Sequence, residues 1–528
     1  MRSPAAAIVW ELGQRRRWGL IAVTGYLIVL AAIKLWVLQS GRRIDLDDES
    51  FALVVIVPLA ATFIYFLAVF SFGLSGDFAA RQSMYPARMF TLPVPTAALA
   101  GWPMLYGTAT MAMLWLATRV FTIWPSDVDV PVIWPALLAA SLVAWTQALT
   151  WMPYPLRGLR VFVTVLWLVT IDTVILIALE SKAHEGVMLA LLAPHVPLAY
   201  LVARFAVARA RRGDVPDWRL GEIARAVRRD PFPSADRAQT WFEWRQYGRS
   251  LPGLVAILLP FELALLFAFS HTPELIFETL LLVLFTPPFM AAFVAATVAY
   301  RMTPFLATRP LTNGSLIAAK LKATMWSTLV AWLLVLVGIP LGLRFSGAAP
   351  VVMERVHRLF EVFGTPRAIA ILLLVLAALM ASTWKQLVQS LYIGMSGREW
   401  IVKASVFAAV SFLAAILPLA VWISRSRYAM AVLWNNIPEI AAVLVLVKLS
   451  AAVWVAMRLH DKHLLSDRTL LLGALGWDVA VFALYGLLVW IFPTLLFHAY
   501  ALALVAILAI PLARLSAAPL ALAWSRHR

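Results

Sequence analysis

The chain has 528 residues, of which 62% are hydrophobic and only 13% are charged, and its mean hydropathy is +0.85. A soluble globular chain is roughly 45–50% apolar, so this composition excludes a soluble fold and predicts a polytopic membrane protein. The absence of Cys excludes disulfides, thiolate metal sites and cysteine nucleophiles.

The first half begins with a short amphipathic segment, residues 4–17, in which Trp10 and Glu11 precede Arg15, Arg16 and Arg17. A helix of this kind lies in the cytoplasmic interface of a membrane and does not cross it. Apolar runs of about 20 residues, enough to span a bilayer, follow it. They lie at about 18–38, 51–75, 103–123, 132–151, 161–180 and 186–208.

The second half repeats this order after a basic cytoplasmic linker, 209–240. Trp241, Glu243 and Arg245 open a second interfacial helix. Six apolar runs follow at about 252–270, 275–298, 319–342, 367–385, 402–423 and 433–456, and two more, 469–491 and 495–514, have no counterpart in the first half. The sequence thus predicts an all-α protein of about fourteen transmembrane helices, with units at 1–208 and 241–457 and two additional helices within 458–528.

Two local matches indicate that the halves are copies of one unit. Without a gap, Thr91 aligns with Thr308, Pro93 with Pro310 and Leu99 with Leu316. At a longer offset, Trp145, Gln147 and Gly158 align with Trp384, Gln386 and Gly397. Since each copy starts on the same side of the membrane, the two six-helix repeats are expected to be parallel.

Charge supports one orientation. With the N-terminus inside, most of the 44 Lys and Arg fall on predicted inner segments, as cytoplasmic loops require. The net charge of +17 is therefore explained by orientation and lipid contact, not by nucleic-acid binding. We expect a bacterial-type cytoplasmic (inner) membrane, with both termini in the cytoplasm.

An interfacial helix, two spans, a cytoplasmic turn built round Thr-x-Pro and four more spans resemble the membrane subunit of type-2 ATP-binding-cassette exporters, with two permease units fused. The resemblance covers the chain to about residue 457; the last two spans and the fusion depart from the family. It implies interfacial elbow helices at Trp10 to Arg17 and Trp241 to Arg249. It also implies ATPase-coupling loops containing Arg88, Thr91, Leu92, Pro93, Val94, Pro95, Thr308, Arg309, Pro310 and Leu311.

The chain itself lacks a nucleotide-binding motif, because no Gly-Lys-Ser or Gly-Lys-Thr occurs in it. The resemblance therefore implies an exporter permease, not an enzyme, that binds no cofactor of its own. ATP and Mg would be bound by separate ATPase subunits, with two docking loops predicting two subunits. Pro93, Pro95 and Pro310 would stiffen the loops, and they equally suit the first turn of the next helix.

Ionisable residues within predicted spans suggest function by default. Lys448 and Asp478 lie at similar depth, which predicts an ion pair that fixes the additional helices to the bundle. Asp172 and Glu262 lie near mid-membrane and could line a translocation path for a cationic substrate. Alternatively, Asp172 is satisfied by Thr170, Thr173 or a neighbouring carbonyl.

Two further clusters of ionisable residues lie in predicted loops. His460 and His463 have a metal-ligand spacing, but they fall in a charged loop without further ligands, so no metal site is predicted. Asp45, Asp47, Asp48 and Glu49 form an acidic cluster that keeps one alternative open, a metal-dependent glycosyltransferase that uses a lipid-linked donor. A second alternative is a lipid or oligosaccharide flippase driven by an ion gradient.

Overall fold

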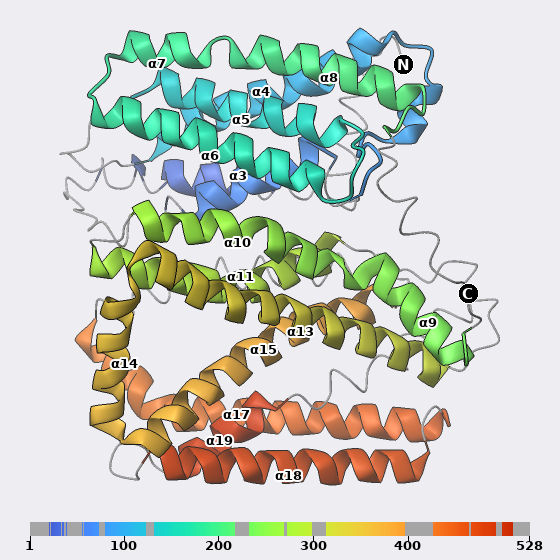
Figure 1. Cartoon of the computed structure of the whole chain (residues 1–528), viewed down its shortest axis with the longest axis vertical. Coiled ribbons are helices and arrows are strands. Elements are labelled where there is room, and N and C mark those ends of the chain that lie inside the picture. Colours follow the sequence, from blue (N-terminus) through green and yellow to red (C-terminus); the bar gives the residue numbers. More distant parts are fainter. Residues whose placement is uncertain are drawn as a thin grey trace. The chain divides into compact units, whose positions relative to one another are not determined.

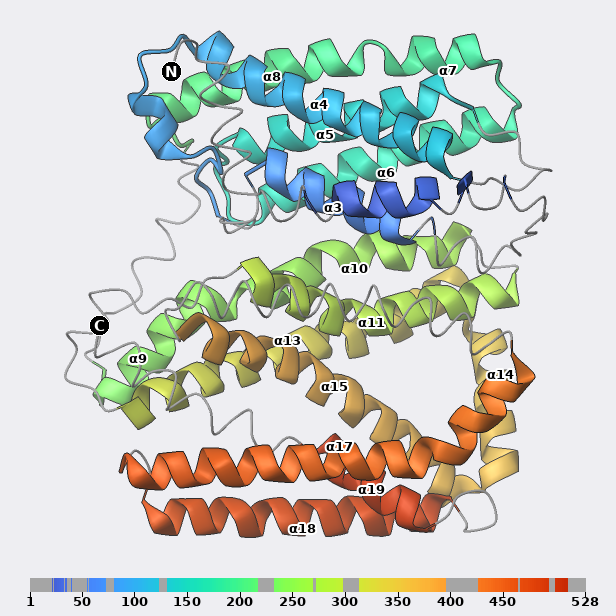
Figure 2. The same cartoon turned by 180° about the vertical axis from the view of Figure 1, so that it is seen from behind.

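The chain forms two compact units in the computed structural model, Met1–Arg228 (unit 1) and Arg229–Arg528 (unit 2) (Figures 1 and 2). Throughout the described residues the regular elements are helices, and no strand occurs among them. The structure describes residues 21, 23–32, 34, 35, 39, 55, 57–72, 80–122, 131–216, 232–268, 272–297, 313–395, 426–463, 466–492 and 499–510.

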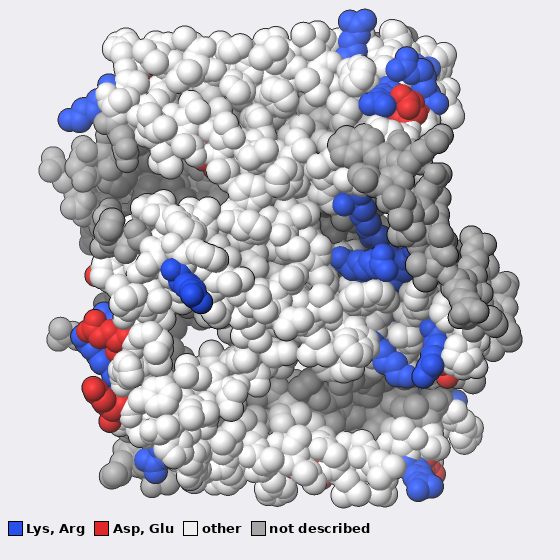
Figure 3. Space-filling view, in the orientation of Figure 1, with Lys and Arg blue, Asp and Glu red and all other residues white. Residues whose placement is uncertain are grey.

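Nine helices in this described part are long and apolar enough to cross a bilayer. This finding confirms the helical fold class for the described residues, with several apolar helices that could span a membrane; the predicted total of fourteen and the repeat arrangement stay predictions. Lys, Arg, Asp and Glu lie mostly toward the ends of the long helices, whose middle stretches carry other side chains (Figure 3). The nine helices are Ile133–Trp151, Leu159–Leu179, Glu185–Arg211, Ala235–Ala268, Pro273–Ala295, Gly314–Ser346, Thr365–Val388, Met430–Asp461 and Asp467–Ile491.

Unit 1 is a bundle in which small residues allow close helix approach. Its elements are α3 (Val57–Phe70), η3 (Ala87–Thr91), α4 (Thr96–Phe121), α5 (Ile133–Trp151), α6 (Leu159–Glu180), α7 (Glu185–Leu192) and α8 (His195–Arg211). Ala199, Ala203 and Ala206 form a fully buried stripe on α8 and share one core cluster with Ala144 and Ala148 of α5. With so little side chain between them, α5 and α8 are held by van der Waals packing.

The sixth predicted span, 186–208, is interrupted in the structure. It consists of α7 and α8, which are separated at Ala193 and Pro194. Pro194 has no N–H to donate to the carbonyl of residue 190, and Pro197 has none for residue 193, so the α-helical hydrogen-bond ladder fails at this point. The interruption lies about one third of the way along the Glu185–Arg211 segment.

Unit 2 begins with a bent helix. Its elements are α9 (Ala235–Glu243), η6 (Trp244–Gly248), α10 (Ser250–Ala268), α11 (Pro273–Thr297), α13 (Asn313–Ser346), α14 (Ala349–Phe363), α15 (Thr365–Met395), α17 (Arg427–Asp461), α18 (Asp467–Ile491) and α19 (Ala499–Ala509). The turn η6 has π-helical hydrogen bonding, and α9 is angled against α10 at this turn (Figure 1). A π-bulge is a recognised cause of such bends.

Two glycines set the distance between α10 and α13. A Cβ at Gly338 would lie 2.7 Å from Leu259 Cδ2, and one at Gly342 would lie 2.8 Å from Leu263 Cδ2. Both distances are shorter than real Cβ contacts, so only glycine fits this spacing without a shift of the leucines. The Gly-x-x-x-Gly pattern thus acts here as it does in other closely packed membrane helices.

Between α13 and α15 the chain forms a crosswise helix. This helix, α14, spans Ala349–Phe363, and none of its residues is fully buried. It runs at a steep angle to α10, α11 and α13 (Figures 1 and 2). Helix α19 packs against both α17 and α18 (Figures 1 and 2), and Leu470 of α18 contacts the buried Val455 and Leu459 of α17.

Candidate functional site: the loop between α3 and α4 and its supports

Residues 80–95 form an ordered loop at the end of unit 1 where α8 terminates (Figure 1). Pro86 precedes the short helix η3, and Pro95 precedes α4, with Ala98 and Leu99 donating to the Pro95 carbonyl. Pro95 therefore directly precedes α4, in agreement with the prediction that a proline suits the start of the next helix. Pro93 lies within the loop.

The loop is anchored on the phenol ring of Tyr85. This side chain is 3% exposed and donates from its hydroxyl to the Leu99 carbonyl at 2.8 Å. Its ring stacks on Phe90 at 5.3 Å and meets Trp151 of α5 edge-on at 5.1 Å. Burial raises the pKa of Tyr85 well above its usual value of 10, so the phenol remains a donor at any physiological pH.

Hydrogen bonds tie the loop to the helices beside it. Ser83 donates to the Trp151 carbonyl at 2.6 Å, and Arg160 of α6 donates to the carbonyl of Gln82. Arg160 is only 1% exposed. Arg211, in the last turn of α8, donates to the carbonyl of Val94 at 2.9 Å and to that of Leu92 at 3.4 Å. The loop is thereby attached to α5, α6 and α8 as well as to α4.

Alternation along the loop divides its side chains into two sets. Leu92 and Val94 pack against the core, whereas Thr91, Pro93 and Pro95 are exposed. The predicted contact residue Arg88 is exposed too, and its carbonyl accepts from the Thr91 hydroxyl at 2.8 Å. On the face shown in Figure 3, Lys and Arg side chains gather at the end of unit 1 where α8 terminates.

The counterpart loop lies outside the described residues, including Thr308, Arg309, Pro310 and Leu311. The first predicted elbow lies outside them as well, with Trp10, Glu11, Arg15, Arg16 and Arg17.

The second elbow is described, and its residues lie on different faces. Trp241 is 42% exposed, and the Arg245 guanidinium lies 5.1 Å from the centroid of its ring. Glu243 is 1% exposed and forms an ion pair with Lys320 of α13, with Oε2 and Nζ 3.0 Å apart. Gln239 donates to the other carboxylate oxygen at 2.9 Å, which leaves both oxygens satisfied.

Sequence reasoning missed Lys320, although a signal for it exists. Lys320, Thr324, Ser327 and Thr328 recur at helical spacing within an apolar segment, and all four are at most 6% exposed. Thr324 accepts from Trp384 Nε1 of α15 at 3.2 Å. This polar stripe inside a predicted span indicates the buried face of α13. Mean hydropathy alone does not reveal it.

The candidates for a translocation path occupy dissimilar places. Asp172 is exposed on α6, and the hydroxyls of Thr170 and Thr173 donate to carbonyls of their own helix, so they do not donate to Asp172. Glu262 is half-buried between α10 and α11, where its Oε1 lies 2.6 Å from the Thr286 hydroxyl. The two acidic residues belong to different units.

Lys448 does not pair with Asp478, although both lie in the described part of the chain. Its ammonium donates to the carbonyl of Leu508 at 3.1 Å and also to those of Ile507 and Ile510, at the C-terminal end of α19. Pro511 has no N–H to satisfy Ile507, so the lysine replaces a missing backbone donor. Asp478 is exposed on α18. The predicted ion pair is therefore wrong, and Lys448 contacts the end of α19 through backbone carbonyls instead.

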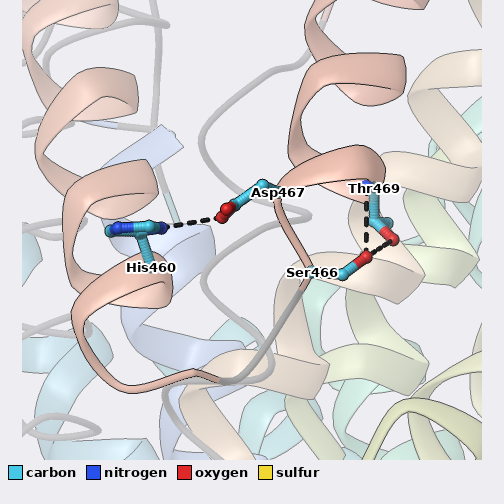
Figure 4. A network of polar contacts seen from close by, with 4 residues as sticks. All are labelled: His460, Ser466, Asp467 and Thr469. Carbon is cyan, nitrogen blue, oxygen red and sulfur yellow. Dashed lines mark hydrogen bonds and ion pairs between the residues drawn. The ribbon is translucent and has the colours of Figure 1, made fainter.

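The turn between α17 and α18 is a polar cap (Figure 4). His460 Nδ1 lies 2.8 Å from Asp467 Oδ1, and Ser466 accepts from the backbone N–H of Thr469 at 3.3 Å, which satisfies the first turn of α18. Among the described residues, no group of three or more His, Cys, Asp and Glu could hold a metal ion. The acidic cluster from Asp45 to Glu49 lies outside them.

Comparison of the chain with protein-family models, with curated proteins and with solved structures finds no match.

Proposed function

We propose that this chain is the membrane-spanning permease of an ATP-driven exporter, with ATP hydrolysed by separate subunits that dock on loops such as residues 80–95. The observation that carries the proposal is the construction of this loop. A loop that merely joined two spans would need no aromatic anchor and no bonds to three other helices. This loop has an aromatic anchor, Tyr85, and hydrogen bonds to α5, α6 and α8. It also exposes the side chains of Arg88, Thr91, Pro93 and Pro95.

Rigidity matters because a partner can move the spans only through an element that does not yield. Pro93 and Pro95 restrict the backbone, and Arg211 links the loop directly to α8. A force applied to the exposed side chains of the loop would therefore be transmitted to α4, α5 and α8 together. Substrate would pass between the two permease units, and the cytoplasmic membrane is the expected location.

Site-directed crosslinking tests the proposal cleanly because the chain contains no Cys. A single cysteine replaces Pro93, and a matched variant carries Val132→Cys at the start of α5; both side chains replaced are exposed. We expect a bifunctional thiol reagent, applied to cells, to link position 93 to a protein that carries a phosphate-binding loop.

The linked protein should hydrolyse ATP when purified with this chain. Equal crosslinking from position 132, or a partner at position 93 without ATPase activity, would reject the docking role.

A further inference from the structure

A cavity of about 270 Å³ lies in unit 1 beside the interruption between α7 and α8. Its walls come from α6, α7 and the first residue of α8, and they are mostly apolar. They are formed by Trp167, Thr170, Ile171, Val174, Ile175, Met188, Leu191, Leu192 and His195. Thr170, Val174 and Leu191 are exposed, so the cavity opens toward the surroundings of unit 1.

His195, which lines the cavity, carries a hydrogen-bond donor. Trp145 Nε1 lies 3.0 Å from His195 Nδ1, and an indole nitrogen can only donate. Nδ1 must therefore be the acceptor, which places the proton of the neutral imidazole on Nε2. Nε2 forms no hydrogen bond with any residue that the structure describes.

The other polar group of the wall is an acceptor. The hydroxyl of Thr170 donates to the Leu166 carbonyl at 2.7 Å and keeps a lone pair free. The rings of Trp145 and Trp167 lie 5.6 Å apart at an interplanar angle of 30°, and His195 is edge-on to both. This aromatic cluster joins α5, α6 and α8 and fixes the orientation of the imidazole.

The depth of His195 in the bilayer limits which acceptors can reach its Nε2–H group. His195 lies 10 residues after Glu185, so at 1.5 Å per residue it is about 15 Å from the start of the segment, near the middle of a bilayer. Ester carbonyls of phospholipids belong to the interfacial zone and do not reach this level. At this depth, the acceptors available to Nε2–H are those of molecules dissolved in the hydrocarbon core. A charged molecule would be excluded by the apolar walls.

We propose that this cavity binds a neutral lipophilic carbonyl compound, whose carbonyl oxygen accepts a hydrogen bond from His195 Nε2–H. The interruption of a span at mid-membrane is a recurrent feature of ligand sites in membrane proteins. The volume is near the lower end of the range for small-molecule pockets, about 300–1,000 Å³. It would therefore hold a head group or one end of a chain.

Binding to the full chain in nanodiscs tests the proposal with three probes: a benzoquinone with a decyl tail, a long-chain ketone, and an alkane of equal length. Affinity is measured from the concentration dependence of thermal stabilisation. Both carbonyl probes, or the quinone alone if the Trp167 ring selects a flat ligand, should bind more tightly than the alkane. We expect His195→Phe to weaken carbonyl binding about fivefold, the usual effect of one neutral hydrogen bond, without changing alkane binding.

Two variants keep the result interpretable. His357→Phe, at an exposed position of α14, makes the same substitution away from the cavity and should bind all probes like the unmodified chain. Val174→Trp adds bulk at an exposed wall position and should abolish binding even if His195→Phe does not fold. The proposal is overturned if the alkane binds as well as the carbonyl probes, or if Val174→Trp leaves binding unchanged.

Discussion

At the scale of single residues, the pair Glu243 and Lys320 is the strongest polar contact between α9 and α13. Removing one member of a buried ion pair leaves an uncompensated charge, which costs about 3–5 kcal/mol. Lys320→Met should therefore lower the unfolding temperature strongly, and adding Glu243→Gln should restore most of it. Thermal unfolding of the purified protein measures both effects.

The matched control for Lys320→Met is Lys322→Met, two residues along α13 on its exposed side. It should leave the unfolding temperature unchanged. A double variant no more stable than Lys320→Met would contradict the role given to this pair.

The hydroxyl of Tyr85 is a second test at this scale. Tyr85→Phe keeps the ring but removes the donor to the Leu99 carbonyl, so we expect a loss of about 1 kcal/mol in the free energy of unfolding. Tyr106→Phe, at a half-buried position of α4, serves as the control. Equal stability of the two variants would mean that the hydroxyl does not anchor the loop.

Tyr85 also predicts a dependence on pH. Burial raises the pKa of Tyr154 to about 12 and raises that of Tyr85 further, whereas in the unfolded chain both phenols ionise near pH 10. The folded state therefore binds more protons above pH 10, and its stability falls as the pH rises from 10 toward 12. In a pH series of unfolding temperatures, Tyr85→Phe should make this fall shallower.

At the scale of elements, Arg211 joins the loop to α8. Arg211→Ala removes the donors to Leu92 and Val94. The loss of about 1 kcal/mol at this exposed site corresponds to about fivefold faster hydrogen exchange of the loop amides. Arg212→Ala, the neighbouring exposed arginine, should leave exchange in residues 87–96 unchanged. If both variants exchange alike, the loop is held without α8.

The end of α19 depends on Lys448 in the same way. Lys448→Met leaves the carbonyl of Ile507 without its side-chain donor, whereas Ile510 still accepts from Trp477 Nε1, so we expect a loss of about 1 kcal/mol in the free energy of unfolding. Asp478→Asn distinguishes the contact between Lys448 and the α19 carbonyls from the ion pair expected from sequence. It should change the unfolding temperature little, because an exposed, unpaired carboxylate contributes little to stability. A loss of unfolding temperature in Asp478→Asn as large as that in Lys448→Met would favour the ion pair instead.

At the scale of the whole molecule, hydropathy predicted the helical class and most spans, because a run of apolar residues is a local property. Hydropathy does not show the interruption at Pro194, because the apolar run is continuous across it, although the two prolines of this run indicate it. Partners of buried polar groups were not predictable. Similar depth in the membrane predicts that Lys448 pairs with Asp478. In the fold, the Lys448 ammonium instead donates to backbone carbonyls at the end of α19.

In the loop at residues 80–95, too, the local pattern was predictable from the sequence and the contacts were not. The sequence identified Thr91 and Pro93 through their recurrence, since repetition needs no knowledge of contacts. It did not reveal that Tyr85, Arg160 and Arg211 hold the loop, because these residues lie far apart along the chain and meet only after folding.

The most direct test of the permease role is the ATPase activity of the complex purified in mild detergent and reconstituted in nanodiscs. With Pro93→Gly and Pro310→Gly together, the hydrolysis rate of the bound ATPase should fall severalfold. Pro273→Gly, at the first residue of α11, should leave it unchanged. A preparation without bound ATPase, or a rate insensitive to the paired loop changes, would contradict the account.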